Sequence, residues 1–317
     1  MTEIVNSPAS VIAAAGTSVN QAAVGMQPGN ATEAEMAVDS EFVGNKLGIG
    51  FYLSGFWIAA ISLAALFAPW LPIKPLEGLE SLGERETAPS LTHFFGTNAN
   101  GKDMFALCIW GARTSLIVGF ASITLGMLTG GTIGIVAGFI GGVFDKVSSF
   151  IILLLLSIPA LILAIFILQS IGNSLFWITI TIAILSIPAL ARLARAQTLA
   201  FAEREFVTAS RALGAKNGRV MVREILPNVL MPLLALALLA MAIAIVAEGT
   251  LSFLGLGAAN SSDSWGKLIF AGTPQTLLKD SPWICFAPIL MIFLTVLSLN
   301  YLGDQVRRRF DVQDIPL

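Results

Sequence analysis

One stretch of the sequence has the residue types and spacing to bind a phosphate group. Residues 96–103 read GTNANGKD, which fits the pattern G-x-x-x-x-G-K of nucleotide-binding loops. Such a loop needs Ser or Thr after the lysine to hold magnesium, but Asp103 stands there, and no buried strand precedes the segment. We therefore reject nucleotide binding and predict a tight turn at 96–103.

The other residues that could do chemistry are scattered. His93 is the single histidine and has no second metal ligand at a usual spacing, and Cys108 and Cys285 do not form a C-x-x-C pair. The sequence also lacks the G-x-S-x-G and H-E-x-x-H patterns of common hydrolases. These observations predict that this chain has no catalytic residue and no metal site.

Glu248 is one acidic residue at the end of an otherwise apolar run. It is a candidate pathway or gate residue that contacts cargo, because ionisable groups are costly in a membrane and usually functional there. The alternative places Glu248 at the outer membrane interface, within reach of water, and we favour this alternative. The glycine-rich residues that follow are too short to span a bilayer, so we expect an external scoop at 251–283.

The composition excludes an ordinary soluble domain. Of 317 residues, 56% are hydrophobic and only 12% are charged. Six apolar runs without a charged side chain are long enough to cross a bilayer: 47–71, 115–139, 149–169, 175–191, 229–247 and 284–302. The predicted fold class is an all-α integral membrane protein with six transmembrane helices.

The positions of Lys and Arg predict how these helices are oriented. Six spans leave both termini on one side, and if that side is the cytoplasm, twelve of the eighteen basic residues are cytoplasmic: Lys46, Lys146, Arg192, Arg195, Arg204, Arg211, Lys216, Arg219, Arg223, Arg307, Arg308 and Arg309. The other six are Lys74, Arg85, Lys102, Arg113, Lys267 and Lys279. Because basic residues favour the cytoplasmic side, we predict that both termini and the segment 192–228 are cytoplasmic.

The rest of the chain divides around these spans. We expect a disordered cytoplasmic tail at 1–46, a first transmembrane helix at 47–73, an extracytoplasmic segment at 74–113 that ends in an interfacial helix at 103–112, a five-helix core at 114–310, and a cytoplasmic C-terminus at 311–317. The tail is rich in Ala, Gly, Ser, Asn and Thr and lacks apolar periodicity. It does not resemble a signal peptide, because its apolar run is too short.

Two patterns within the spans predict how helices pack and bend. Gly126, Gly130, Gly134 and Gly138 recur every fourth residue and form a bare stripe that lets another helix approach closely. We favour packing within this chain over a contact with a second subunit. The S-I-P sequences that end at Pro159 and Pro188 predict kinks, which are either hinges of a gate or static bends.

The charged segment 192–228 lies between apolar runs and predicts a helical hairpin. Phe206, Ala209 and Leu213 fall on one face of its first helix, and Gly214 follows where a helix end favours positive φ. A second short helix is expected at 216–226, ending at Pro227. The first helix either lies on the membrane surface or inserts Phe206 and Leu213 into a groove of a cytoplasmic partner.

The sequence FVTASRALGAKNGRVMVREILPN resembles the coupling loop of ABC importer permeases, with Thr208 and Ser210 where that family usually has Glu and Ala. Further motifs are similar to the C-type permease subunit of dipeptide, oligopeptide and nickel importers: 96–119, AGFIGGVFD, LSFLGLG, SWG and NYLGDQVR. The resemblance covers about residues 96–310. It implies that the ATPase-coupling residues are Glu205, Phe206, Thr208, Ala209, Ser210, Arg211, Leu213 and Gly214.

The resemblance also implies an architecture and a function. It implies the type I, MetI-like permease fold in a bacterial inner membrane, with a cytoplasmic coupling helix. The expected partners are a homologous second permease subunit, two cytoplasmic ATPase subunits that bind the ATP and magnesium, an extracytoplasmic solute-binding protein and the lipid bilayer, but no nucleic acid. Peptides are the expected cargo, nickel or another small solute is the alternative, and an ion-coupled secondary transporter is the rival class.

Overall fold

The computed structural model describes residues 48–70, 85–258 and 263–311. The described helices all belong to one compact unit, Ile49–Leu317. The expected tail at 1–46 and all but the first residue of the expected C-terminus at 311–317 lie outside the described residues. Within the described ranges the chain is helical apart from turns, short connections and one isolated bridge between Thr97 and Asp103.

Five helical runs are long and apolar enough to cross a membrane, and a sixth crossing is possible if one sharply bent helix pair counts as a span. The elements of the five runs are α3 (Ile49–Phe67); α4 (Met104–Gly126), η2 (Met127–Gly131) and α5 (Thr132–Ile140); α8 (Leu175–Ala202); α10 (Asn217–Val220), η3 (Met221–Ile225), α11 (Leu226–Leu251) and η4 (Ser252–Leu256); and α14 (Trp283–Asp311). The bent pair is α6 (Gly142–Ser157) and α7 (Ala160–Ile171). This arrangement agrees with the six expected spans.

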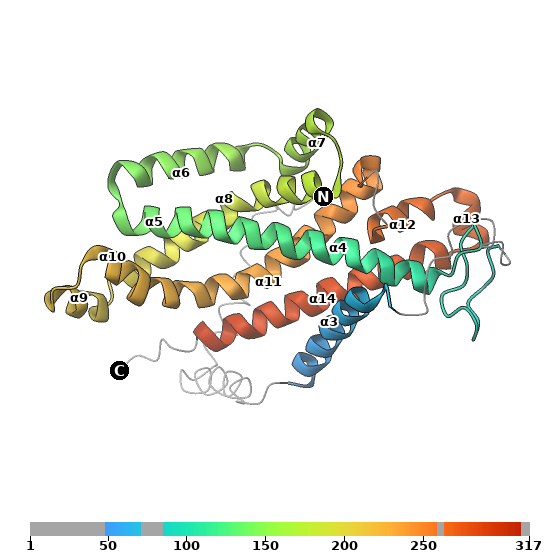
Figure 1. Ribbon diagram of the computed structural model, residues 1–317, viewed down its shortest axis with the longest axis horizontal. Coiled ribbons are helices and arrows are strands. Elements are labelled where there is room, and N and C mark those ends of the chain that lie inside the picture. Colours follow the sequence, from blue (N-terminus) through green and yellow to red (C-terminus); the bar gives the residue numbers. More distant parts are fainter. Residues whose placement is uncertain (1–47, 71–84, 259–262, 312–317) are drawn as a thin grey trace, which may run out of the picture. The chain divides into compact units, whose positions relative to one another are not determined.

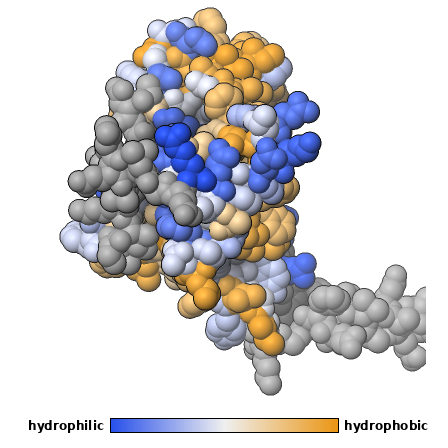
Figure 2. Space-filling view, turned by 90° about the vertical axis from the view of Figure 1, so that its right-hand side faces the viewer, coloured by the Kyte–Doolittle hydropathy of each residue, from blue (hydrophilic) through white to orange (hydrophobic). Residues whose placement is uncertain are grey.

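Short helices lie at both ends of the long ones. Helix α9 (Glu205–Ala212) lies at one end, which we call the α9 end. Helices α12 (Trp265–Ala271) and α13 (Gln275–Asp280) lie at the other, which we call the α12 end (Figure 1). The scoop expected at 251–283 therefore contains two short helices, and Figure 2 shows a group of hydrophilic residues across the middle of this end.

Three buried clusters hold the long helices together. At the α12 end, Met104 and Leu107 of α4 belong to one cluster with Trp265 of α12 and residues of α14. The middle cluster joins α4, α7, α8 and α11, and a third cluster at the α9 end joins α5, α8, α9 and α11. Helix α3 packs against α14 and α4, where the Trp57 indole donates a hydrogen bond of 3.2 Å to Thr295 Oγ1.

The structure corrects the expected interfacial helix at 103–112. These residues form the start of α4, which continues without a break into the second span. Asp103 begins the helix, because its carboxylate accepts the backbone N–H groups of Phe105 and Ala106. Cys108 and Ala112 are fully buried, so this part of α4 belongs to the packed core of the protein.

The third expected span, at 149–169, is broken. Helices α6 and α7 meet at an angle of 88°, and Ile158 between them is extended, with φ −88° and ψ 128°. The cause is Pro159, because proline disfavours helical backbone at the residue before it. By contrast, α8 runs through Pro188 without a break, so the two prolines have different consequences.

The second helix of the expected hairpin does not end at Pro227. Helix α10 passes through the wider π-helical turn η3 into α11, which has proline in its first turn. Proline lacks a backbone N–H, and in the first turn of a helix this N–H has no carbonyl partner within the helix. The wider π-helical turn before Pro227 lets the helix continue although this hydrogen bond is missing. Most of the expected loop 192–228 is therefore helix that extends the long runs.

Candidate functional site

Helix α9 is a short, well-bounded helix between α8 and α10. Arg204 precedes it in an extended conformation, and its carbonyl oxygen accepts the N–H groups of Val207 and Thr208 at 3.1 and 3.3 Å. At the other end Gly214 has φ +85°, as the sequence predicted, and its N–H bonds to the carbonyl of Arg211. These contacts define a helix of two turns that projects from the end of α8.

One side chain anchors α9 to the helices behind it. Val207 is fully buried and packs in the third cluster with Ala194 of α8, Val220 of α10 and Val229 of α11. The sequence pattern identified only the face with Phe206, Ala209 and Leu213, which was expected to contact a partner or the membrane, because eight residues are too few to reveal a second periodic face. The anchoring role of Val207 was missed by sequence reasoning.

The residues implied as ATPase-coupling residues are mostly at the surface. Leu213 is 89% exposed and Phe206 39% exposed. Exposed with them are Glu205, Thr208, Ala209, Arg211 and Gly214, whereas Ser210 is half-buried. Exposed Phe206 in the first turn of α9 and exposed Leu213 directly after its last residue, on a helix that Val207 anchors, suit binding to a protein groove.

Arg211 connects α9 to a second element. Its guanidinium carbon lies 5.6 Å from the centre of the Phe139 ring, close to the end of α5. This distance suits a cation–π interaction, which contributes about 0.5–1 kcal/mol at an exposed position. The contact ties α9 to α5, in addition to the helices that Val207 touches.

An ion pair joins α6 to α8 in the same region. Two of the three guanidinium nitrogens of Arg195 donate to the Asp145 carboxylate: Nε donates to Oδ1, and Nη2 donates to Oδ2 at 2.8 Å. The planar guanidinium fits a carboxylate in this two-bonded way, which fixes orientation as well as distance. Sequence reasoning treated Arg195 only as a topology signal and did not pair it.

The four glycines of the predicted stripe lie against α8 of the same chain. A Cβ atom added at Gly134 would lie 2.2 Å from the Ala191 carbonyl oxygen, and one at Gly130 would lie 2.7 Å from the Ile187 carbonyl oxygen. At Gly126 the added atom would lie 2.0 Å from Ser186 Oγ, and at Gly138 it would lie 2.9 Å from the Arg195 carbonyl oxygen. The stripe therefore makes a backbone-to-backbone contact within this subunit.

Glu248 is buried, not at a water-accessible interface as we favoured from the sequence. It is 2% exposed, and its two carboxylate oxygens accept hydrogen bonds from Ser115 Oγ at 2.8 Å and Ser252 Oγ at 2.7 Å. The favoured interpretation failed because the helix at 265–271, which the sequence pattern did not reveal, packs over this position. In this structure the carboxylate does not line an open pathway.

The turn at 96–103 has the expected compact form. Gly96 and Gly101 have positive φ, and Asn98 Oδ1 accepts the N–H groups of Asn100 and Lys102 at 2.9 Å. His93 Nδ1 lies 2.9 Å from Asp103 Oδ2, a pairing that the sequence did not predict. The segment therefore builds the start of α4 rather than a phosphate site.

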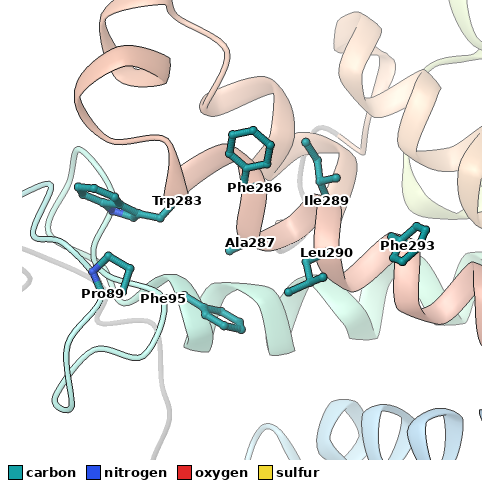
Figure 3. A pocket seen from close by; sticks show the side chains of 8 residues that line it. All are labelled: Pro89, Phe95, Trp283, Phe286, Ala287, Ile289, Leu290 and Phe293. Carbon is teal, nitrogen blue, oxygen red and sulfur yellow. The ribbon is translucent and has the colours of Figure 1, made fainter. Parts of the chain in front are cut away.

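A cavity of about 370 Å³ lies beside the N-terminal part of α14. Figure 3 shows its lining, which consists of apolar and aromatic side chains: Pro89, Phe95, Trp283, Phe286, Ala287, Ile289, Leu290 and Phe293. The Trp283 indole nitrogen donates to the Thr97 carbonyl at 3.2 Å. The lining lacks the polar groups that would bind the termini of a peptide, so we do not assign the cargo site to this cavity.

Comparisons with known proteins agree with this geometry. Residues 130–312, more than half of the chain, match the protein family described as "Binding-protein-dependent transport system inner membrane component". The dipeptide transport system permease protein DppC of Alkalihalophilus pseudofirmus is 37% identical over 254 residues, which are 80% of this chain and 83% of that protein. The glutathione transport system permease protein GsiD of Pectobacterium atrosepticum is 31% identical over 81% of this chain and 85% of its own length.

A solved structure supports the fold. A chain of the MetNI methionine ABC transporter in an inward-facing conformation matches with a TM-score of 0.52 and 19% identity, over 65% of this chain and 97% of that chain. At this identity the likeness establishes the fold alone. Together with the family match and the two permeases, it shows that the chain belongs to the inner membrane components of binding-protein-dependent transport systems, among the permease subunits of the peptide ABC importer family.

Proposed function

We propose that this chain forms half of the translocation pathway of an ATP-driven peptide importer and receives the ATPase movement through α9. The proposal rests on the family membership and on the relatives, which are named as dipeptide and glutathione permeases. It assigns the chain itself no catalytic role: partner subunits bind and hydrolyse ATP with magnesium. A second, homologous permease subunit supplies the other half of the pathway.

The observation that carries the coupling role is the two-sided character of α9. Val207 is fully buried in the cluster that joins α5, α8 and α11, whereas Leu213 is 89% exposed and Phe206 39% exposed. A partner that binds the exposed side of α9 and moves it would therefore also displace the three long helices that contact its buried side. Each large apolar side chain that becomes buried in a partner contributes about 1.5–3 kcal/mol, which is enough for coupling of usual allosteric size.

The distribution of basic residues supports a cytoplasmic position of the α9 end. Of the sixteen described Lys and Arg residues, eleven lie on elements that start or finish at the α9 end, including the C-terminal part of α14. The other five are Arg85, Lys102, Arg113, Lys267 and Lys279. By the positive-inside rule, α9 then faces the ATPases, and the α12 end faces the solute-binding protein.

Peptides are the proposed cargo class. The relatives described above are named for dipeptides and glutathione, which is itself a small peptide, and they give no support to nickel. We propose alternating access as the mechanism: closure of the ATPases displaces α9, which moves α5, α8 and α11 together and opens the pathway toward the α12 end. An ion-coupled secondary transporter is not supported, because the family match is to binding-protein-dependent systems.

Copurification tests the docking role of α9. A tagged chain is coexpressed with its transporter partners as wild type, as Phe206→Asp/Leu213→Asp, and as Leu199→Asp. Leu199 is a matched control, because it is also 39% exposed but lies on α8. We expect the amount of copurified ATPase to fall at least tenfold in the double variant and to stay at the wild-type amount in the control. Full retention in the double variant would support the alternative that α9 only lies on the membrane surface.

A further inference from the structure

Glu248 is the final acceptor of a buried hydrogen-bond network at the α12 end. It lies one turn before the end of α11, and its carboxylate accepts one hydroxyl from α4 and one from η4, those of Ser115 and Ser252. Ser264 Oγ in turn lies 3.1 Å from Ser252 Oγ, to which it donates. All four side chains are at most 3% exposed.

The same network reaches α12 through its first residues. Ser264 begins α12 by accepting the N–H of Lys267, and the backbone N–H of Trp265 donates to Ser115 Oγ at 3.4 Å. The Trp265 indole donates to the carbonyl of Cys108 on α4 at 2.8 Å. The distant helix α4 and the two neighbouring elements, α11 with η4 and α12, therefore share one set of hydrogen bonds.

The backbones also meet closely at this place. A Cβ atom added at Gly266 would lie 2.3 Å from the carbonyl oxygen of Gly249, so α12 touches α11 without an intervening side chain. Trp265 is fully buried and covers Cys108, which is also fully buried. Helix α12 has only seven residues, too few to hold this position by its own stability, so its contacts must hold it.

A buried carboxylate without a cation is costly unless hydrogen bonds satisfy it. Within the described residues Glu248 forms no ion pair, and the groups that donate to its carboxylate are the hydroxyls of Ser115 and Ser252. Removing the carboxylate would leave the Ser115 and Ser252 hydroxyls buried without this acceptor. Every hydroxyl in the network therefore has an acceptor only while residue 248 accepts hydrogen bonds from both Ser115 and Ser252.

We propose that Glu248 is the positioning residue that locks α12 onto α4 and α11, so that the outer helices move together with α11. The helical run Asn217–Leu256 begins beside α9 and ends in this network, which makes it the direct connection between the two ends. Displacement of α9 is thereby passed to α12. This consequence for transport rests on the proposed function, whereas the lock itself does not.

Maleimide labelling of Cys108 tests the lock without any transport assay. The chain has two cysteines, so a Cys285→Ser background leaves Cys108 as the single thiol beneath Trp265. We expect Glu248→Met, which keeps the length of the side chain but accepts no such bonds, to raise the labelling rate at least tenfold. Glu248→Gln keeps one acceptor oxygen, and the loss of one ordinary hydrogen bond predicts a rise of about threefold to fivefold.

Thr295→Val is the matched control for a general loosening of the helices. It removes the interhelical bond between Trp57 and Thr295, which joins α3 to α14 and does not involve α12. We expect this variant to label Cys108 within twofold of the wild-type rate. Wild-type labelling in Glu248→Met, or equal labelling in Thr295→Val and Glu248→Met, would overturn the lock.

A second readout follows ATP hydrolysis in the reconstituted complex with its solute-binding protein. For Glu248→Met we expect the ATPase subunits to stay bound and the stimulation by cargo-loaded binding protein to fall at least fivefold, with partial rescue by Glu248→Gln. Unchanged stimulation would overturn the link from the lock to transport. If even the wild-type complex imports no peptide, the proposed function fails, while the labelling result still decides whether Glu248 holds α12.

Discussion

Glycine residues determine how closely the run of η2 and α5 approaches α8. Gly130 and Gly134 leave room for the backbone of α8, where an added Cβ atom would lie 2.7 and 2.2 Å from carbonyl oxygens. In a membrane, close packing drives helix association more than apolarity does, because lipid is as apolar as the side chains. The stripe is thus a contact that larger residues cannot replace.

Gly134→Ala should destabilise the protein for this reason. The added methyl group forces α5 away from α8, and overpacking of this kind costs about 1–3 kcal/mol. Gly218→Ala on α10 is the control, because an added Cβ there meets no atom within 4 Å and alanine favours helix. Thermal unfolding in detergent should show a lower midpoint for Gly134→Ala only; equal midpoints would contradict the close contact.

Arg211 makes a second test at the scale of single residues. Phe139→Leu removes the aromatic face beneath the guanidinium but keeps an apolar side chain, which should weaken the attachment of α9 by about 0.5–1 kcal/mol. Hydrogen exchange of the α9 amides should then accelerate about twofold to fivefold. The same substitution in an Arg211→Ala background should add little; a full additional effect would show that the two residues do not interact.

Among the elements, the sequence predicted those with a repeating pattern and missed contacts that depend on short helices. Long apolar runs identified the spans, and the glycine repeat identified a packing face. Val207 was missed because α9 is too short for a periodic pattern, and Glu248 was misplaced because its burial depends on α12, a helix that starts 17 residues later in the chain. Long-range contacts of this kind are not encoded in local spacing.

The bend between α6 and α7 gives a geometric prediction. Spin labels at Phe144 and Ile171, both exposed, lie on opposite arms of the 88° bend. With a rise of 1.5 Å per residue, their backbones should be about 29 Å apart, compared with about 40 Å in a straight helix. The distance between the two spin labels, measured by electron–electron double resonance in the wild-type protein, should centre near the shorter value.

Pro159→Ala tests the cause of that bend. Because alanine lets Ile158 adopt helical backbone, the distance distribution should gain a longer component. Pro188→Ala is the control, since α8 is already continuous through that residue, and it should leave the distribution unchanged. A wild-type distance near 40 Å would contradict the bend itself, and identical distributions in Pro159→Ala and wild type would contradict its cause.

At the scale of the whole molecule, the two ends of the long helices have different tasks in this account. The α9 end presents an anchored helix with exposed Phe206 and Leu213, and the α12 end is joined to it through one helical run that finishes at Glu248. The sequence predicted five long crossings, the turn at Gly214 and the family, and the bent pair of α6 and α7 stands where it predicted the sixth crossing. It did not predict the buried links by which one end would move the other.

Peptide import by the reconstituted complex tests this account most directly. Proteoliposomes that contain the complex, with ATP inside and the loaded binding protein outside, should accumulate a radiolabelled dipeptide. With Phe206→Asp/Leu213→Asp, we expect import to fall at least tenfold, because this variant loses its ATPase subunits. Import and a hydrolysis response at wild-type levels in that variant would contradict coupling through α9.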